Sequence, residues 1–501
     1  MNPITHCKLG ELVRKLTISD NWTGSDVCYL ARHCPFVTEI AVKASFGMNC
    51  LSCFNNWTSL ENFTLECLTG FPASLPTEFL RDRLVILKIT AESIQPWIKI
   101  IEQLPAVEHL TIERPRRGFG IAGELQYTDL ETIHNNLPRL YSFSLFTQVY
   151  GSLPRNVVPC DTVRQLSLVT EYYGGWGEYF AKKYQRLETL SIYKPGGYWH
   201  APDDIRTLAK SCFWLRRLSI DDYAAYCSFV DILQSIHAPV SYIYYASHDA
   251  SWFFRVVDCF HKTISEVNVH VQNDVPVKLV LESLCNCRAL TDLTLECSNY
   301  YFRIDMLLKQ LKSLKVLSIK GPRIGVEKFR TRDIQHCLKD VKMSAKVIAN
   351  EVYMYLSQCC PGIVSLDCHY LCGRNYPVNI YYPQPGLRQL AVSSCYSYVF
   401  KLTRMTAEER IKEPSRKRCG SNKIQQPVGC TKWYSTFEMY GAIPGYADNS
   451  RPHRIKEIVA EPEENNNCAN VFRARRIITS IQCSYVDRIV LNGAELRDNT
   501  R

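Results

Sequence analysis

The stretch LTDLTLECSNYYFRIDMLLKQLKSLKVLSIK, residues 290–320, decides the fold because it contains the same pattern of apolar residues twice. In this pattern an apolar residue is followed by a second one three positions later and a third one two positions after that. The first copy starts at Leu290 and the second starts 24 residues later, at Leu314. A period of roughly 20 to 50 residues is typical of a solenoid, in which repeats stack on one another.

The same pattern runs through most of the chain. Its first copy starts at Val13 and its last regular copy starts at Leu387. Most copies start 23 to 28 residues apart, and one longer interval of 33 residues separates Val107 from Leu140. We therefore expect about sixteen irregular repeats in a single solenoid over residues 1–395.

Each repeat is expected to contain one short strand followed by a helix. The last two apolar residues of the pattern lie two positions apart, so they point to the same face of a strand. Helical spacing of apolar residues follows in 204–212, 277–287 and 304–311. Stacking buries the apolar face of each repeat on its neighbours. This predicts an α/β solenoid of horseshoe shape, with parallel strands on the concave face and helices on the convex face.

Composition agrees with a folded protein that contains a large apolar core. The chain has 501 residues, of which 46% are hydrophobic and 22% are charged. No run of about 18 uncharged apolar residues occurs, so we expect no membrane-spanning helix. The first ten residues lack the basic and apolar segments of a secretory signal, so we expect a cytoplasmic or nuclear protein.

The cysteines are interpreted mainly as buried thiols. The chain has 23 of them, and residues such as Cys34, Cys212 and Cys360 come late in the predicted helices. A buried thiol behaves as a small hydrophobic group. A disulfide framework is the alternative, and it would be expected in an oxidising compartment.

Short phrases at the predicted repeat boundaries resemble the F-box/leucine-rich-repeat family, which has a ribonuclease-inhibitor-like solenoid. Residues 30–40, LARHCPFVTEI, and residues 357–366, SQCCPGIVSL, are similar to that family's helix end, Cys-Pro turn and next strand. The resemblance covers roughly residues 9 to 395. It implies a leucine-rich-repeat fold and a role as the substrate-recognition receptor of a ubiquitin ligase.

The F-box of that family, a segment of three helices before the repeats, is not present in this chain. The repeats start by residue 13, and the similar string at 75–80 is followed too closely by the next strand. The box is therefore expected to be missing by truncation or by loss. Binding to a Skp-like adaptor and a cullin ligase is expected only if an F-box is supplied upstream.

No motif predicts catalysis, so we expect a protein that is not an enzyme and needs no cofactor. The chain contains no phosphate-binding GxxxxGK[ST], no GxSxG and no HExxH sequence. Residues 118–123 match GxGxxG, but they lie in an inserted loop rather than after an opening strand. Cys50 and Cys53 form a CxxC without a second pair at zinc spacing, so we expect no metal site.

Aromatic and basic residues that follow the predicted strands are the candidate partner-binding residues. Loops held by a rigid scaffold often bind partners, and Tyr, Trp and Arg are enriched at interface hot spots. The candidates are Arg114, Arg116, Arg117, Tyr172, Tyr173, Trp176, Tyr193, Tyr198, Trp199 and Tyr223. The alternative is that these residues pack between loops. A nucleic-acid partner is not expected, because no known nucleic-acid module is present.

The pattern is lost after Val392. Residues 401–425 contain eight Lys or Arg and three Glu, and 414–418 resemble a short nuclear-import signal or a solvated loop. We expect an irregular basic and polar insertion over 396–484. Val486, Ile489 and Leu491 restore the pattern once, which predicts a closing strand and a tail over 485–501.

The sequence thus predicts a protein–protein interaction scaffold, with substrate recognition in ubiquitin-dependent degradation as the leading hypothesis. The partner would bind the concave face or the aromatic rim. A general interaction scaffold without a ligase and a small-molecule receptor of the same fold are the alternatives.

Overall fold

The strands and helices below are those of a computed structural model of the chain. It describes residues 12–19, 23–43, 54–67, 77–91, 93–114, 125–147, 149–169, 175–193, 202–220, 227–247, 251–271, 277–327, 335–371, 378–394, 399–404, 431–435, 456–458, 478–483, 486–492 and 494–496. The chain divides into two units, one of residues 1–244 and 251–260 and the other of residues 245–250 and 261–501.

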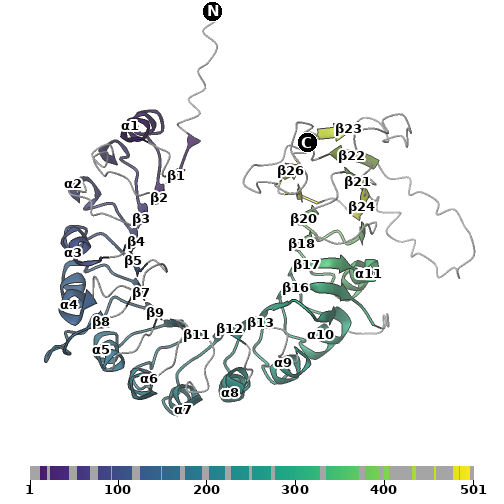
Figure 1. Cartoon of the computed structure of the whole chain (residues 1–501). Helices are drawn as coiled ribbons and strands as arrows, with labels where there is room; N and C mark the ends of the chain where they lie inside the picture. Colours follow the sequence, from purple (N-terminus) through teal and green to yellow (C-terminus); the bar gives the residue numbers. More distant parts are fainter. Residues whose placement is uncertain are drawn as a thin grey trace, which may run out of the picture. The chain divides into compact units, whose positions relative to one another are not determined.

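Unit 1 alternates strands with helices along the chain (Figure 1). Its strands are β1 (Lys15–Ser19), β2 (Glu39–Lys43), β3 (Asn62–Cys67), β4 (Ile86–Ala91), β5 (His109–Glu113), β6 (Leu125–Gln126), β7 (Ser142–Phe146), β8 (Val149–Tyr150), β9 (Gln165–Val169), β10 (Thr189–Tyr193), β11 (Arg217–Ile220) and the start of β12 (Tyr242–Ser247). Its helices are α1 (Gly24–His33), α2 (Thr77–Leu80), α3 (Gln95–Ile101), α4 (Tyr127–Asn136), α5 (Trp176–Lys183), α6 (Pro202–Ala209), α7 (Cys227–Ser235) and α8 (Ser251–Phe260).

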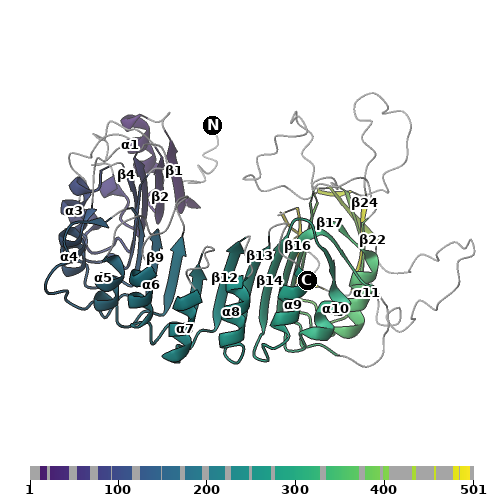
Figure 2. The same ribbon diagram turned by 60° about the horizontal axis from the view of Figure 1, so that its bottom comes forward.

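The strands of unit 1 pair in parallel, and their register follows the sequence pattern. Leu110 of β5 aligns with Phe143 of β7, and Phe143 aligns with Leu166 of β9. These side chains are fully buried beneath the helices, which lie along one side of the sheet (Figure 2). The predicted repeat register is therefore confirmed, because a shift by one residue would turn the apolar side chains away from the core.

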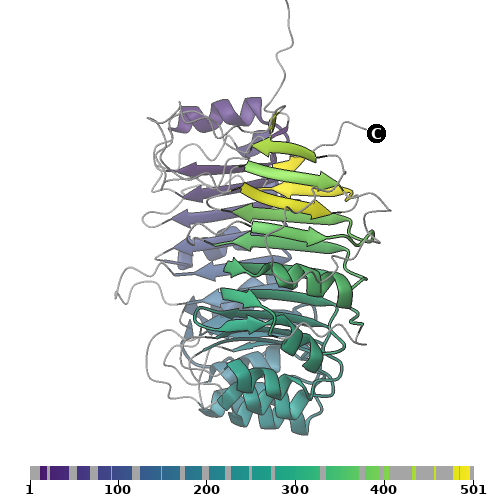
Figure 3. The same ribbon diagram turned by 90° about the vertical axis from the view of Figure 1, so that its right-hand side faces the viewer.

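Unit 2 continues the same pattern. Its first elements are β13 (Glu266–Val271), α9 (Val277–Leu284), β14 (Asp292–Cys297), β15 (Tyr301–Arg303), α10 (Ile304–Gln310), β16 (Val316–Gly325), β17 (Asp340–Ile348), α11 (Asn350–Cys359), β18 (Ser365–Tyr370) and β20 (Gln389–Ser394). Leu293 aligns with Val267 on one side and with Leu317 on the other. The strands run side by side in Figure 3, and the α/β leucine-rich-repeat solenoid is the fold of this chain.

A second sheet takes the place of the helix layer near the end of unit 2. Its strands, in spatial order, are β19 (Val378–Tyr382), β24 (Ile478–Cys483), β21 (Val399–Arg404), β22 (Thr431–Ser435) and β23 (Lys456–Ile458). The side chains of Ile380, Phe400 and Ile481 on its strands are buried. The expectation of an irregular segment over 396–484 differs from this arrangement, since four of the five strands come from it.

The chain then returns to the main sheet. Strand β25 (Arg488–Leu491) pairs in parallel with β20, and Ile489 and Leu491 align with Leu390 and Val392. A short antiparallel strand, β26 (Ala494–Leu496), follows it. The position predicted for a closing strand is thus occupied by β25.

Most described cysteines carry thiols, and the buried ones lie at the predicted positions. Burial raises the pKa of Cys212, Cys360 and Cys368 to about 12, so these side chains remain protonated. Cys28 of α1 is an exception, because it is disulfide-bonded. The expectation that the cysteines are reduced is therefore wrong for Cys28.

Candidate functional site

The side of the unit 1 sheet away from the helices is called the open face here. Its residues alternate with the buried ones along each strand, as in β7, where Ser142, Ser144 and Phe146 are half-buried between fully buried Phe143 and Leu145. Side chains on this face contact neighbouring strands rather than the apolar core. They are therefore available to contact a partner.

A row of hydroxyl groups crosses the open face. Thr111, Ser144, Ser167, Ser191 and Ser219 occupy matching positions in five adjacent strands, β5, β7, β9, β10 and β11. Neighbouring parallel strands lie about 4.8 Å apart, so these five side chains form a line of small hydrogen-bonding groups. An extended polar chain could approach this row closely, because no member is large.

Tyr193, one of the predicted binding residues, lies beside this row. The rings of Tyr193 and Phe146 are 5.6 Å apart between centroids, and both side chains are half-buried at the ends of their strands. The backbone N–H of Arg114 donates to the carbonyl oxygen of Phe146 at 3.2 Å. The structure thus places the Tyr193 ring against Phe146, which was not among the predicted binding residues, and holds the backbone of Arg114 at the end of the same strand as Phe146.

Trp176 has a different place from the one predicted. It is the first residue of α5, and its side chain is buried at 7% exposure, so it packs in the core rather than on an exposed rim. The carboxylate of Asp204, in α6, accepts hydrogen bonds from the backbone N–H groups of Gly175 at 2.9 Å and Gly177 at 3.1 Å. These bonds hold the start of α5 against the next repeat.

The remaining predicted binding residues lie outside the described residues. They are Arg116, Arg117, Tyr172, Tyr173, Tyr198, Trp199 and Tyr223. Their role on an aromatic rim stays a prediction.

Exposed aromatic residues occur instead where the strands of unit 1 begin. Phe213 and Trp214, in the turn before β11, are 55% and 56% exposed, and Tyr141, just before β7, is 38% exposed. The guanidinium carbon of Arg217 lies 3.7 Å from the ring centroid of Tyr242 on the next strand. These residues were not among the predicted binding residues, because they precede strands and the predicted ones were sought in loops that follow strands. Two adjacent aromatic residues between buried Cys212 and Leu215 were the signal that was available.

The corresponding face of the unit 2 sheet carries charged residues as well. His270 of β13 lies 3.0 Å from Glu296 of β14, and Glu296 is also paired with Lys320 of β16. On β18, His369 lies 3.0 Å from Asp367. These side chains are about one quarter to one half exposed, so the ion pairs contribute little to stability but define a polar surface.

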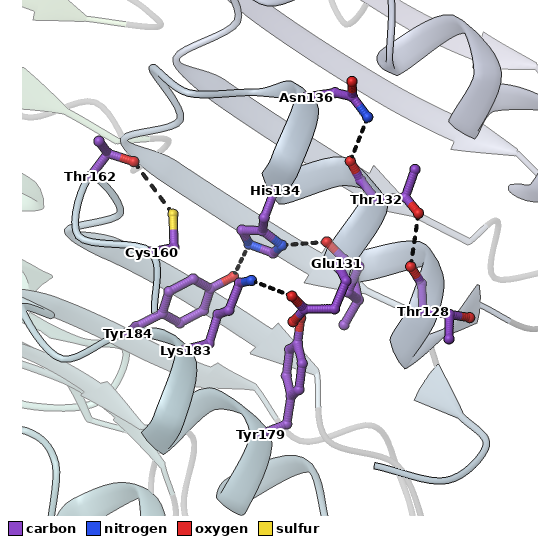
Figure 4. A network of polar contacts seen from close by, with 11 residues as sticks. Thr128, Glu131, Thr132, His134, Asn136, Cys160, Thr162, Tyr179, Lys183 and Tyr184 are labelled. Carbon is purple, nitrogen blue, oxygen red and sulfur yellow. Dashed lines mark hydrogen bonds and ion pairs between the residues drawn. The ribbon is translucent and has the colours of Figure 1, made fainter. Parts of the chain in front are cut away.

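A buried polar network joins α4 to α5 on the helix side of unit 1 (Figure 4). The ammonium group of Lys183, at 1% exposure, donates to one carboxylate oxygen of Glu131 at 2.8 Å. The hydroxyl of Tyr179 donates to the other oxygen at 2.8 Å. The Glu131 carboxylate therefore neutralises the buried charge of Lys183 and also accepts a hydrogen bond from Tyr179.

His134 completes this network. Its Nδ1 lies within hydrogen-bonding distance of the carbonyl oxygen of Leu130, which can only accept, so Nδ1 carries the proton. Nε2 then accepts from the hydroxyl of Tyr184 at 2.6 Å. Burial, together with the charge of Lys183, lowers the pKa of His134 to about 3. This neutral histidine is enclosed by partners and serves to join the two helices.

Among the described residues, no group of three or more His, Cys, Asp or Glu side chains is arranged to hold a metal ion. Cys50 and Cys53 lie outside the residues that the structure describes. In the described part of the chain, none of the helices combines the length and the apolar character that a membrane crossing requires.

Comparisons with known proteins find similarity to solved structures. No protein-family model matches the sequence, and no curated protein matches it. The crystal structure of a TLR13–ssRNA13 complex is similar, with 12% identity over 72% of this chain and a TM-score of 0.38. The chain spans 59% of that TLR13 chain.

An internalin, InlF of Listeria monocytogenes str. 4b F2365, is also similar. Its identity is 13%, with 72% of this chain and 82% of the internalin covered and a TM-score of 0.21. The assignment of the fold rests on the strand register of this chain itself.

Proposed function

We propose that this chain is a non-catalytic scaffold that holds a protein partner on its open strand face. We further propose that it does so as the substrate-recognition receptor of an F-box-type ubiquitin ligase, in the cytoplasm or the nucleus. The observation that carries the binding role is the hydroxyl row over Thr111, Ser144, Ser167, Ser191 and Ser219, because it places small polar groups on a continuous surface.

The shape of this row suits an extended segment of a protein partner. Serine and threonine hydroxyls both donate and accept, so they can pair with a backbone in either orientation. The rings of Phe146 and Tyr193, whose centroids are 5.6 Å apart, lie beside the row and offer an apolar surface there. Aromatic side chains next to hydrogen-bonding groups are common at protein interfaces.

The proposal of an F-box-type receptor rests on the repeat boundaries. Cys34 and Cys360 end their helices, both are buried, and each carbonyl oxygen accepts a hydrogen bond from the following repeat. The donors are the indole N–H of Trp57 at 2.9 Å and the hydroxyl of Tyr382 at 3.3 Å. This repeated junction supports the resemblance that the Cys-Pro phrases suggested. A Skp-like adaptor and a cullin would bind through an F-box supplied upstream.

Affinity capture with a charged open-face variant tests the proposal. The double substitution Ser167→Arg and Ser191→Arg places two large cations in the middle of the row, at half-buried positions outside the core. The chain joined downstream of an F-box segment should capture a defined set of proteins together with a Skp-like adaptor. The variant should lose the substrate proteins and keep the adaptor, because the adaptor binds elsewhere.

A matched control carries the same charges on the helix side. Thr128→Arg and Asn135→Arg change exposed residues of α4 and should leave capture unchanged. If the open-face variant captures the same substrate proteins as the parent chain, the hydroxyl row is not where they bind. Capture of partners without any adaptor would favour the general scaffold over the ligase receptor.

A further inference from the structure

The edge of unit 1 at which its strands begin carries a second surface, separate from the hydroxyl row. Four residues on this edge are aligned by backbone hydrogen bonds from one repeat to the next. Arg164 N–H donates to the carbonyl oxygen of Tyr141 at 2.8 Å, and Glu188 N–H donates to that of Arg164 at 2.8 Å. Arg216 N–H donates to the carbonyl oxygen of Glu188 at 2.9 Å. We call these four residues, with Arg139, Arg186, Phe213 and Trp214, the strand-start edge.

Phe213 and Trp214 are held outward by their neighbours. Cys212 and Leu215, on either side of them, are buried at 1% and 0% exposure. The thiol of Cys212 donates to the carbonyl oxygen of Leu208 at 3.2 Å, and the N–H of Leu215 donates to the carbonyl oxygen of Cys212 at 3.3 Å. Because both ends of the turn are anchored in the core, the two aromatic side chains remain at the surface.

The fold itself does not require aromatic residues in this turn. The equivalent pairs in three other repeats are Pro138-Arg139, Gln185-Arg186 and Arg288-Ala289, which also lie between two buried residues. Polar or small residues therefore suffice to connect the helix to the strand. Phe213 and Trp214 are each more than half exposed, and exposed large apolar residues mark interaction sites when they adjoin one another.

The charge around these aromatic residues is predominantly positive. The turns 137–141, 160–165, 184–189 and 210–217 together contain six Lys or Arg residues and two acidic residues. The acidic residues are Asp161 and Glu188, and Glu188 lies 3.9 Å from the guanidinium of Arg164. The excess of cations favours an anionic partner, since complementary charges accelerate association and select the partner.

We propose that the strand-start edge binds an acidic peptide segment of a partner protein, with an apolar side chain of that segment against Phe213 and Trp214. Arginine forms bidentate pairs with carboxylates, and Trp and Arg are the side chains most often found at interface hot spots. A continuous nucleic-acid backbone fits less well, because Asp161 and Glu188 would repel its phosphates, whereas a peptide can place its carboxylates between them. The inference does not depend on the open face.

Fluorescence anisotropy with synthetic peptides tests the proposal. The probe is a labelled octapeptide, Glu-Asp-Glu-Leu-Phe-Glu-Asp-Glu, and its neutral counterpart carries Gln and Asn in place of the acids. The full chain should bind the acidic probe more tightly than the neutral one, and added salt should weaken this binding. The double substitution Phe213→Ser and Trp214→Ser should weaken it by about tenfold or more.

The control uses the equivalent turn of unit 2. Arg288→Ser and Ala289→Ser should leave binding of the probe unchanged, and both double variants should keep the melting temperature of the parent chain. The proposal is overturned if the acidic probe does not bind, or if the Phe213 and Trp214 variant binds it as tightly as the parent does. Tighter binding of a labelled oligothymidylate than of the acidic peptide would overturn it as well, in favour of a nucleic-acid partner.

Discussion

Lys183 of α5 and Glu131 of α4 form an ion pair of 2.8 Å in which the lysine side chain is only 1% exposed. The two residues lie on helices of different repeats, so their charges are paired only when those repeats are stacked. The hydroxyl of Tyr179 donates a hydrogen bond to the second carboxylate oxygen of Glu131. The pair therefore depends on the stacking of the two repeats.

Removal of the carboxylate should destabilise unit 1 strongly. Glu131→Gln leaves the ammonium group of Lys183 buried without a counter-charge, and we expect a loss of about 3 kcal/mol or more in the free energy of unfolding. Urea denaturation followed by circular dichroism measures this loss. The double variant Glu131→Leu and Lys183→Met should be less destabilised than Glu131→Gln alone. Equal losses would show that the pair is not buried as described.

Stability should fall as the pH decreases, because of His134. Its pKa is lowered from 6.5 to about 3 in the folded chain, first by burial and then by the charge of Lys183. Between these two values the unfolded chain binds a proton that the folded chain does not, so acid favours unfolding. One such group contributes up to about 1.4 kcal/mol per pH unit.

Denaturation midpoints measured from pH 7 to pH 4 test this effect. His134→Gln should flatten the dependence on pH, although it also removes the hydrogen bond from Tyr184. His33→Gln changes an exposed histidine of α1 and should keep the slope of the parent chain. An unchanged slope in the His134 variant would rule out this histidine as the source.

Gly177 should not tolerate a side chain. A Cβ atom at this position would lie 1.9 Å from the carbonyl oxygen of Asp204, which belongs to the backbone of the next repeat. Gly177→Ala should therefore lower the free energy of unfolding by about 1–3 kcal/mol and push α5 away from α6. Gly362→Ala is the matched control, because its nearest neighbour is at 3.6 Å, an ordinary contact distance. Thermal unfolding of both variants should show a lower midpoint for Gly177→Ala alone.

Leu293 should be essential for unit 2. It is 1% exposed and lies between Val267 and Leu317 on the neighbouring strands. Leu293→Asp buries an unpaired charge and should unfold several adjacent repeats, with loss of circular dichroism signal. Thr294→Asp, one residue further on the half-buried open face, should retain the fold. If Leu293→Asp melts like the parent chain, the proposed register is wrong.

The strand register could be read from the sequence because it depends on local periodicity. The alternation that buries Leu293 and turns Thr294 to the open face recurs along the repeats, and only one register buries the apolar residues of each strand. The same reasoning predicted the closing strand, β25, which pairs with β20 although more than ninety residues separate Val392 from Leu491. The helices α6, α9 and α10 also begin at or close to the predicted positions.

The second sheet could not be read from the sequence. Strand β24 pairs with β19 and with β21. In the pair of β19 and β24, Val378 aligns with Thr479, which lies about one hundred residues later in the chain. Pairing between segments so far apart depends on which strand edge remains open after the repeats have stacked. Local composition, which is basic and polar in this region, carries no information on that choice.

The sequence by itself determined the repeat, its register and the direction in which each strand's side chains point, because these follow from a period of two residues within a period of about 24. Only the tertiary structure decided which aromatic residues are exposed. Trp176 is buried because Asp204 of the next repeat holds the start of α5, whereas Phe213 and Trp214 stay outside because Cys212 and Leu215 fill the core. Exposure depends on contacts between repeats, and those contacts exist only after the chain has folded.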